Sequence, residues 1–103
     1  MSRQQEAPLV LDGLKVVSFC HYLQGPAGAQ YLADMGAEVI KVEPIGGAFE
    51  RHWSGADTYI DGVSAFYLAA NRNKRAIALD LKHPEGKAVA LELIERADVV
   101  MEN

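Results

Sequence analysis

Polar residues and glycines gather after an apolar run near the start of the chain, in the segment Cys20-His-Tyr-Leu-Gln-Gly-Pro26. The run from Leu14 to Cys20 has the β-branched centre of a buried strand, and Pro26 suits the first turn of a helix. Ligands of open α/β sheets bind beyond the carboxyl ends of strands, where the free N–H groups at a helix start favour a phosphate or carboxylate. The segment is therefore a candidate anion site. The alternative is that Gly25-Pro26 only makes a tight entry to the helix.

Two more specific chemistries are disfavoured at this turn. Gly25 and Gly28 lack the G-x-G-x-x-G spacing of dinucleotide-binding loops. Cys20 and His21 are adjacent, so on a strand they would point to opposite faces, which favours a buried structural cysteine and a loop histidine over a thiol–imidazole pair. No spacing of histidines and acids completes a catalytic triad or a metal site.

Other candidate residues lie further along the chain. Asn73-Lys74-Arg75 places two cations before a predicted strand, either as a clamp for a polyphosphate or carboxylate or as a solvated loop. His83 precedes Pro84, where it is expected to help cap a helix, and Trp53 is expected to cover the core rather than line a pocket. Acids also stand near the ends of predicted strands, but their spacing assigns no general acid or base: Glu43, Asp80 and Glu102.

The elements that position these residues follow from hydrophobic periodicity. Residues 14–20 predict a strand, residues 26–35 a helix that ends at Gly36, and residues 38–43 a second strand. About 30 residues then hold one βαβ unit, the usual size of a right-handed crossover between parallel strands.

The second half of the chain repeats this alternation. Residues 44–63, with Pro44 and several glycines, predict a long loop, and residues 64–70 a short helix. A strand over 75–81, a helix opening at Pro84-Glu85 and a strand beginning at Asp98 follow. The pattern predicts an α/β fold with a mainly parallel sheet, in one domain over residues 11–103 after a flexible lead-in at 1–10.

Composition narrows the class of protein. The chain has 103 residues, 50% of them hydrophobic and 23% charged, as expected of one small globular domain. The net charge of −4 argues against nucleic acid as a partner. The single cysteine cannot form an internal disulfide, and neither a membrane-spanning stretch nor a targeting peptide is visible. We expect a soluble cytoplasmic protein without a metal.

The stretch from Leu11 to Asn103 resembles the N-terminal part of class III coenzyme A transferases, the formyl-CoA and carnitine-CoA transferase family of the CaiB/BaiF superfamily. Three segments in the same order carry the resemblance: Leu11-Asp-Gly-Leu-Lys-Val-Val17, Gly25-Pro-Ala-Gly-Ala-Gln-Tyr-Leu-Ala-Asp-Met-Gly-Ala-Glu-Val-Ile-Lys-Val-Glu-Pro44, and Asn71-Arg-Asn-Lys-Arg-Ala-Ile-Ala-Leu-Asp-Leu-Lys-His-Pro-Glu-Gly86.

The resemblance implies an incomplete Rossmann-like domain and the transfer of CoA from an acyl-CoA to a carboxylic acid. In the family an aspartate attacks the donor thioester, and that aspartate lies downstream of the matched region. We therefore expect no catalytic residue in this chain and no transferase activity from it alone. Family members form interlocked homodimers, so this piece is expected to expose apolar surface and to self-associate.

The resemblance also implies which residues contact CoA, the substrate cofactor: Leu23, Gln24, Leu79, Asp80, Leu81, Lys82 and Asn103. The segment 79–82 would hold the nucleotide end, with Lys82 suited to a phosphate, and Asn103 would lie beside the thiol arm. Two positions depart from the family pattern, because some members carry glutamine at Leu23 and a phosphate-binding arginine at Pro44.

Two alternatives stay open. One is a fragment of an α-methylacyl-CoA racemase, a class of the same superfamily whose acid–base residues also lie beyond this chain. The other is a truncated, non-catalytic CoA-binding domain. The chain ends at Asn103 within or just after a predicted strand, which leads us to expect a front piece of a larger enzyme.

Overall fold

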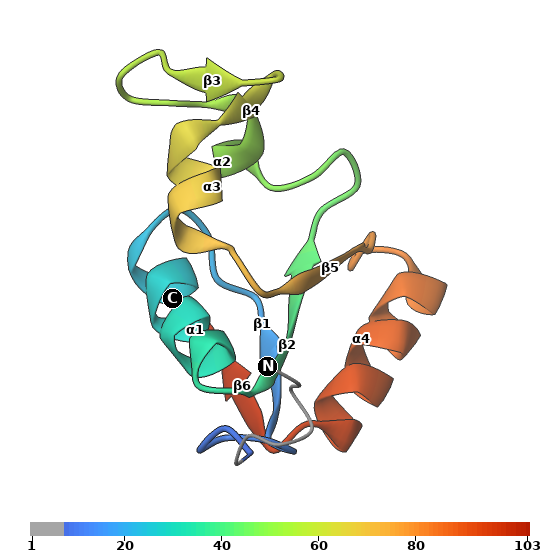
Figure 1. Cartoon of the computed structure of the whole chain (residues 1–103). Coiled ribbons are helices and arrows are strands. Elements are labelled where there is room, and N and C mark those ends of the chain that lie inside the picture. Colours follow the sequence, from blue (N-terminus) through green and yellow to red (C-terminus); the bar gives the residue numbers. More distant parts are fainter. Residues whose placement is uncertain (1–7) are drawn as a thin grey trace.

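A four-stranded parallel sheet forms the centre of the molecule in the computed structural model, which describes residues 8–103. Its strands lie in the order β5-β2-β1-β6. Their bounds are Lys15–Ser18 for β1, Glu38–Glu43 for β2, Arg75–Ala78 for β5 and Val99–Met101 for β6. Two long helices, α1 (Gln24–Asp34) and α4 (Pro84–Arg96), lie on opposite sides of the sheet (Figure 1). The predicted α/β fold with a parallel sheet is confirmed.

The strand order defines where a ligand would sit. Helix α1 connects β1 to its neighbour β2, whereas α4 carries the chain from β5 across the sheet to β6. The connection that follows β1 therefore crosses one face of the sheet, and the connection that precedes β6 crosses the other. The border between β1 and β6 is the switch point, the place at which open α/β sheets bind ligands. At that place the N–H of Phe19 donates to the carbonyl of Met101 over 2.9 Å, just beyond the paired ends of β1 and β6.

Small side chains form the core between the sheet and α1. Its buried members are Val16, Ala29, Ala33, Ala37 and Val39. Alanines on the inner side of α1 let the helix approach the valines of β1 and β2 closely. On the other side α4 is less deeply packed, because only Ala90 of that helix is buried.

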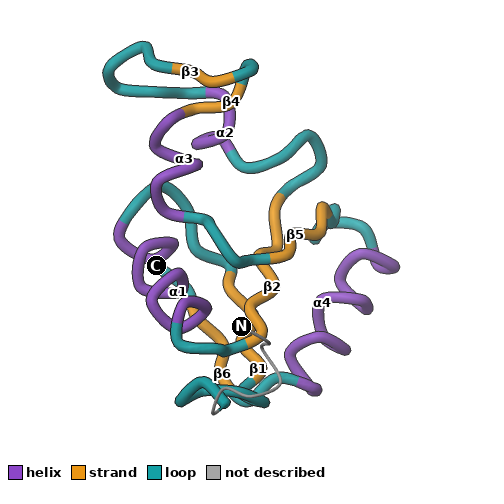
Figure 2. Tube along the Cα trace, in the orientation of Figure 1, coloured by secondary structure: helices purple, strands orange, loops and turns teal. Residues whose placement is uncertain are grey.

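A smaller unit stands at the carboxyl end of the sheet, where 44–63 was predicted to be one long loop. That prediction was wrong, because the segment holds the helix α2 (Phe49–His52) and a two-stranded hairpin of β3 (Tyr59–Ile60) and β4 (Val63–Ser64). The turn between these strands is Asp61-Gly62, with positive φ angles of 50° and 79°, which is the strongest short hairpin signal in sequences. Figure 2 shows the unit joined to the sheet by loops.

The remaining boundaries agree closely with expectation. Helix α3 (Ala65–Ala70) was expected over 64–70, and α4 begins at Pro84 as predicted. His83 caps α4, since its Nδ1 accepts from the N–H of Glu85 over 3.2 Å. Strand β5 ends at Ala78 rather than Leu81, because the chain turns there: the N–H of Lys82 donates to Oδ1 of Asp80 over 3.0 Å.

Candidate functional site

A cavity of about 530 Å³ opens at the carboxyl ends of β1, β2 and β5. It is lined by Phe19, His21, Val42, Glu43, Pro44, Ile45, Leu79, Asp80, Leu81 and Lys82. The segment 79–82, singled out from the sequence, therefore lines this cavity in full. Among the described residues most of the lining is apolar, and Lys82 is the single lysine or arginine in it. Such a wall suits a flat apolar ring together with one anionic group.

The turn at 79–82 is held firmly from both sides. The N–H of Leu79 donates to the carbonyl of Glu43 over 2.8 Å, and the N–H of His83 donates to that of Asp80 over 3.1 Å. A Cβ on Gly86 would lie 2.1 Å from the carbonyl oxygen of Asp80, so α4 can pack against the turn only with glycine there. The backbone of the turn is thus positioned in advance of any ligand.

Asn103 joins β6 to the turn after β1. Its Oδ1 accepts from the N–H of His21 and its Nδ2 donates to the carbonyl of His21, both over 3.1 Å. Gly25 lies close to this contact, since a Cβ added to it would be 2.5 Å from Cβ of Cys20. The residue Cys20 is 1% exposed. The structure thereby places Asn103 at the switch point, and the expected burial of Cys20 is confirmed.

Leu23 and Gln24 begin α1 at the same turn. Leu23 is the N-cap residue, and its apolar side chain makes no capping hydrogen bond. Gln24 is the first residue of the helix. Neither these two residues nor Asn103 lines the cavity of about 530 Å³. The predicted CoA contacts therefore fall into two groups, one in the cavity wall and one at the neighbouring turn. His21 belongs to both places, because it lines the cavity and its backbone is held by Asn103.

A buried ion pair lies beneath His21. Nζ of Lys41 donates to Oε2 of Glu50 over 2.8 Å and to the carbonyl of Cys20 over 2.9 Å. The two side chains are 1% and 0% exposed. Burial raises the pKa of Glu50, but the hydrogen bond from Lys41, the backbone hydrogen bonds and the charge of Lys41 together outweigh it, and the pKa lies below the ordinary 4.5. Glu50 is therefore a carboxylate at neutral pH. Nothing in the sequence singled out either residue.

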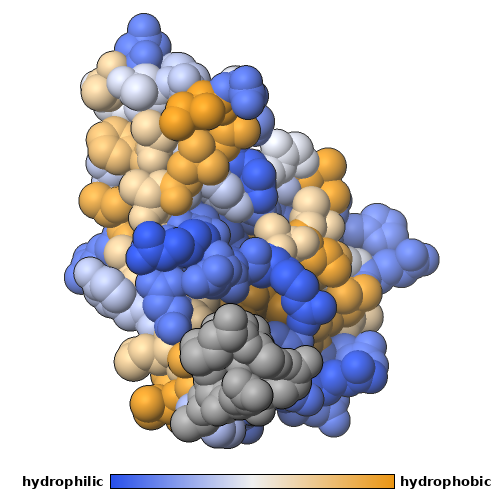
Figure 3. Space-filling model, in the orientation of Figure 1, coloured by the Kyte–Doolittle hydropathy of each residue, from blue (hydrophilic) through white to orange (hydrophobic). Residues whose placement is uncertain are grey.

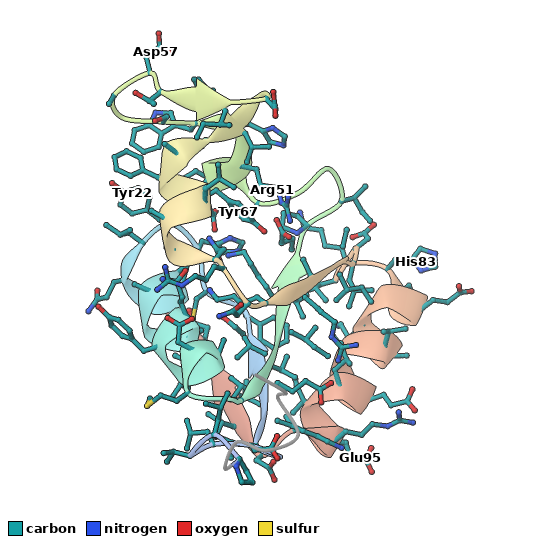
Figure 4. The ribbon with its side chains drawn as sticks, viewed as in Figure 1. Tyr22, Arg51, Asp57, Tyr67, His83 and Glu95 are labelled. Carbon is teal, nitrogen blue, oxygen red and sulfur yellow. The ribbon has the colours of Figure 1, made fainter. Side chains whose placement is uncertain are left out.

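A second hydrogen-bond network joins Glu43 and Arg51. The carboxylate of Glu43 accepts from Nε and Nη2 of Arg51 over 2.5 and 2.7 Å and from the N–H of Ala48 over 2.8 Å. Nη2 of Arg51 also donates to the hydroxyl of Tyr67 over 2.6 Å (Figure 4). Burial raises the pKa of Glu43, yet the hydrogen bonds from Arg51 and from the N–H of Ala48, with the charges of Arg51 and Lys41, together hold it below 4.5. Glu43 is thus a structural carboxylate rather than a free base, although it stands at the end of a strand.

The cations of Asn73-Lys74-Arg75 contact their own chain instead of forming a clamp around the cavity. Nζ of Lys74 donates to the carbonyls of Pro26 and Ala70 over 2.7 and 3.0 Å, and burial lowers its pKa to about 8. Arg75 pairs with Glu38. Lys74 therefore fastens the start of α1 to the end of α3, which neither of the two expectations for this segment had included.

Trp53 does not cover the core, so that expectation was wrong. It is 46% exposed and lines an open hollow with Tyr22 and Phe49. Its ring stacks on Phe66 with centroids 5.8 Å apart, and Tyr22 meets both rings edge-on. We call Tyr22, Phe49, Trp53 and Phe66 the aromatic cluster. Its rings stabilise the hairpin unit against the turn that follows β1.

Neither a metal site nor a membrane-spanning helix is found among residues 8–103. In that part of the chain no group of three or more His, Cys, Asp or Glu side chains is arranged to hold a metal ion. Within the same residues no helix has both the length and the apolar character to cross a membrane.

The fold is that of an α/β protein with a cavity at the carboxyl ends of its parallel strands. The model of CoA-transferase family III matches residues 11–103. The chain therefore belongs to CoA-transferase family III.

Named relatives are similar over nearly the same stretch. Succinate--glutarate CoA-transferase of Agrobacterium fabrum is 45% identical over 100 residues, which is 90% of this chain and 24% of that protein. Human succinyl-CoA:glutarate CoA-transferase is 40% identical over 94 residues, or 90% of this chain and 21% of that protein. The chain thus spans about a quarter of the length of these relatives and corresponds to their N-terminal portion.

The fold is shared with a solved structure. A CAIB/BAIF family protein from Brucella suis superposes with a TM-score of 0.85 at 41% identity, covering 94% of this chain and 26% of that one.

Proposed function

We propose that this chain is the N-terminal part of a CoA transferase that moves CoA from an acyl-CoA to a carboxylic acid. The chain contributes one part of the CoA site and holds no nucleophilic aspartate. Membership of CoA-transferase family III and the transferase names of the relatives support this over the racemase and over a non-catalytic remnant. One domain, residues 11–103, forms this part of the enzyme. The expected lead-in at 1–10 lies mostly outside the described residues.

The observation that carries the proposal is the cavity wall at 79–82. The segment that matches a CoA-contacting stretch of the family lies at the carboxyl ends of parallel strands, with its backbone fixed and one lysine at the rim. Leu79 and Leu81 offer apolar surface for the adenine ring, and Lys82 offers a mobile positive charge for a phosphate. Leu23, Gln24 and Asn103 would hold the arm that leads to the thiol.

CoA as the acyl-CoA substrate is the ligand proposed, and no metal is needed for its binding. The covalent chemistry implied by the family resemblance divides the exchange into easier steps at an aspartate outside this chain. The residues present here would bind and orient the cofactor. We further propose that the whole protein works in the cytoplasm as the interlocked homodimer that the resemblance implies.

Binding of CoA to the chain tests the proposal by titration calorimetry. Lys82→Glu reverses the one lysine charge of the cavity wall and is expected to weaken CoA binding about tenfold or more. Lys87→Glu is the matched control, because Lys87 is exposed on α4 and does not line the cavity. Absence of CoA binding, or equal losses in both variants, would overturn the proposal.

Activity requires the complete polypeptide from the natural source. That polypeptide should transfer CoA from succinyl-CoA to a dicarboxylic acid such as glutarate, detected as a new acyl-CoA by mass spectrometry. The present chain alone should give no product above a protein-free control. Product from the chain alone would contradict the placement of the nucleophile.

A further inference from the structure

Within residues 8–103, two buried polar atoms at the edge of the cavity face each other without a hydrogen-bond partner. They are Nδ1 of His21 and Oε1 of Glu50, and they lie 3.5 Å apart. Buried polar groups in native proteins are nearly always paired, so an unpartnered pair at this distance indicates a contact that tightens when the site is filled.

The protonation of Glu50 decides which of the two atoms can donate. Its other oxygen already accepts from the buried Lys41 over 2.8 Å, and the residue is 0% exposed. A carboxylate held in this way accepts hydrogen bonds and donates none. The atom opposite it must therefore be a donor, so Nδ1 of His21 carries the hydrogen. In a neutral imidazole Nε2 is then an acceptor.

The rest of His21 faces the ligand side. Its backbone N–H and carbonyl are both engaged by Asn103, which fixes the position of the residue. The side chain remains 41% exposed although Nδ1 is buried, and it lines the cavity. In an imidazole ring the edge opposite Nδ1 includes Nε2, so with Nδ1 toward Glu50 this edge points away from the carboxylate.

We infer that Glu50 is a positioning residue that holds His21 with Nδ1 protonated, so that Nε2 presents a hydrogen-bond acceptor to the cavity. The ligand group it takes is a neutral donor, an amide N–H or a hydroxyl. This inference rests on the proposed function, since CoA carries such groups on its arm, its ribose and its adenine, whereas its ionised phosphates carry no donor. His21 and Lys82 then recognise different groups of one ligand.

The tautomer of His21 is tested first, without any ligand. Long-range ¹H–¹⁵N correlation spectra at pH 8, where an unperturbed imidazole is neutral, should show Nδ1 protonated and Nε2 unprotonated. In the double variant Lys41→Met/Glu50→Gln the carboxylate is gone and no buried lysine is stranded, so the two tautomers should mix. A wild-type His21 protonated at Nε2, alone or together with Nδ1, would overturn the inference.

Binding of CoA tests the second part of the inference, that Nε2 of His21 accepts a hydrogen bond from the ligand. His21→Asn keeps a donor near Glu50 but has no acceptor at the position of Nε2, so CoA should bind about three- to tenfold more weakly. His21→Gln can place its amide oxygen near the position of Nε2 and should restore binding. His52→Asn is the control, because His52 is an exposed histidine that contacts Gly46 and does not line the cavity.

The outcomes separate this inference from the proposed function. If His21→Asn binds CoA like the wild type while Lys82→Glu is impaired, His21 contacts no part of the ligand and the inference fails alone. If the wild-type chain binds no CoA, the proposed function and the ligand assignment fail together. The spectra then still decide whether Glu50 positions the His21 ring.

Discussion

At the scale of single residues, most charges near the cavity are neutralised within the chain. Lys41 pairs with Glu50 and Arg51 pairs with Glu43, so their charges are not free for a ligand. Lys82 is left as the lysine that lines the cavity. Pro44 lines the same wall at the position where the family resemblance implies an arginine in some members, so the proposed recognition of phosphate would depend on fewer charges than in those members.

Pro44→Arg is therefore expected to strengthen CoA binding about fivefold at low salt, because it adds a cation to the cavity wall. The gain should shrink as ionic strength rises, since exposed charges are screened. Calorimetric titrations at two salt concentrations measure both effects. An unchanged or weakened affinity at low salt would show that the phosphate does not lie beside this position.

Gly25 and Gly28 provide a matched pair of substitutions within α1. A Cβ on Gly25 would lie 2.5 Å from Cβ of Cys20 and 3.0 Å from Cγ of Asn103, whereas a Cβ on Gly28 would meet only Met101 at 3.7 Å. Gly25→Ala should lower the free energy of unfolding by about 1–3 kcal/mol. Gly28→Ala should leave it equal or raise it by up to about 1 kcal/mol. Urea unfolding compares them, and equal losses would refute the close approach at Gly25.

At the scale of elements, two carboxylates tie β2 to α2 and the loop before it. Glu43 at the end of β2 is 3% exposed, and Glu50 within α2 is 0% exposed. Each accepts a hydrogen bond from a cation on the other side of the loop, Arg51 and Lys41 respectively. The packing of α2 against the sheet therefore depends on both carboxylates being ionised.

Stability should fall in acid for this reason. The folded-state pKa of both carboxylates lies below the ordinary 4.5, so their contribution is complete above that pH and is lost as pH falls through the lower, folded-state values. Urea midpoints should be similar at pH 7 and 5.5 and decline below pH 4.5. The variant Lys41→Met/Glu50→Gln should show a smaller decline. A flat profile down to pH 3 would exclude a role for these carboxylates in stability.

The sequence predicted the elements whose signals are local. Strand β2 (Glu38–Glu43), the start of α4 at Pro84 and the cap at His83 all depend on neighbouring residues, and each agrees with the structure. The hairpin around Asp61-Gly62 was missed although its turn signal is strong, because strands of two residues show no periodicity.

The contacts that the sequence did not predict join residues that are distant along the chain. Lys41 and Glu50 meet only because the chain turns back after β2, and Asn103 reaches His21 only because β6 pairs with β1. The spacing of residues in the sequence does not predict such long-range contacts. The segment 79–82 was found through the family resemblance, and the structure explains it by placing the end of β5 at the cavity.

At the scale of the whole molecule, apolar side chains remain on the surface in several places. Figure 3 shows hydrophobic surface over the hairpin unit and beside α4 on the face in view. Among the exposed side chains are Phe49 and Trp53 of the aromatic cluster, at 55% and 46%, and Leu91 of α4 at 58%. Surfaces of this kind mark places where a soluble protein associates.

Self-association of the chain is expected to proceed through the aromatic cluster. The weight-average sedimentation coefficient should rise with concentration, and Phe49→Ser/Trp53→Ser should reduce the rise. Val10→Ser is the control, because Val10 is 87% exposed and lies outside the cluster. A monodisperse monomer at every concentration would contradict the expectation.

A ¹H–¹⁵N correlation spectrum of the chain, recorded during titration with CoA, tests whether the carboxyl end of the sheet binds CoA. Binding there should cause saturable shifts of the backbone signals of Leu79, Asp80, Leu81 and Lys82, together with those of His21 and Asn103. Signals of the core residues Ala33 and Ala37, which do not line the cavity, should stay in place and serve as an internal reference. No shifts at millimolar CoA, or shifts confined to the aromatic cluster, would contradict the claim that the carboxyl end of the sheet is a CoA site.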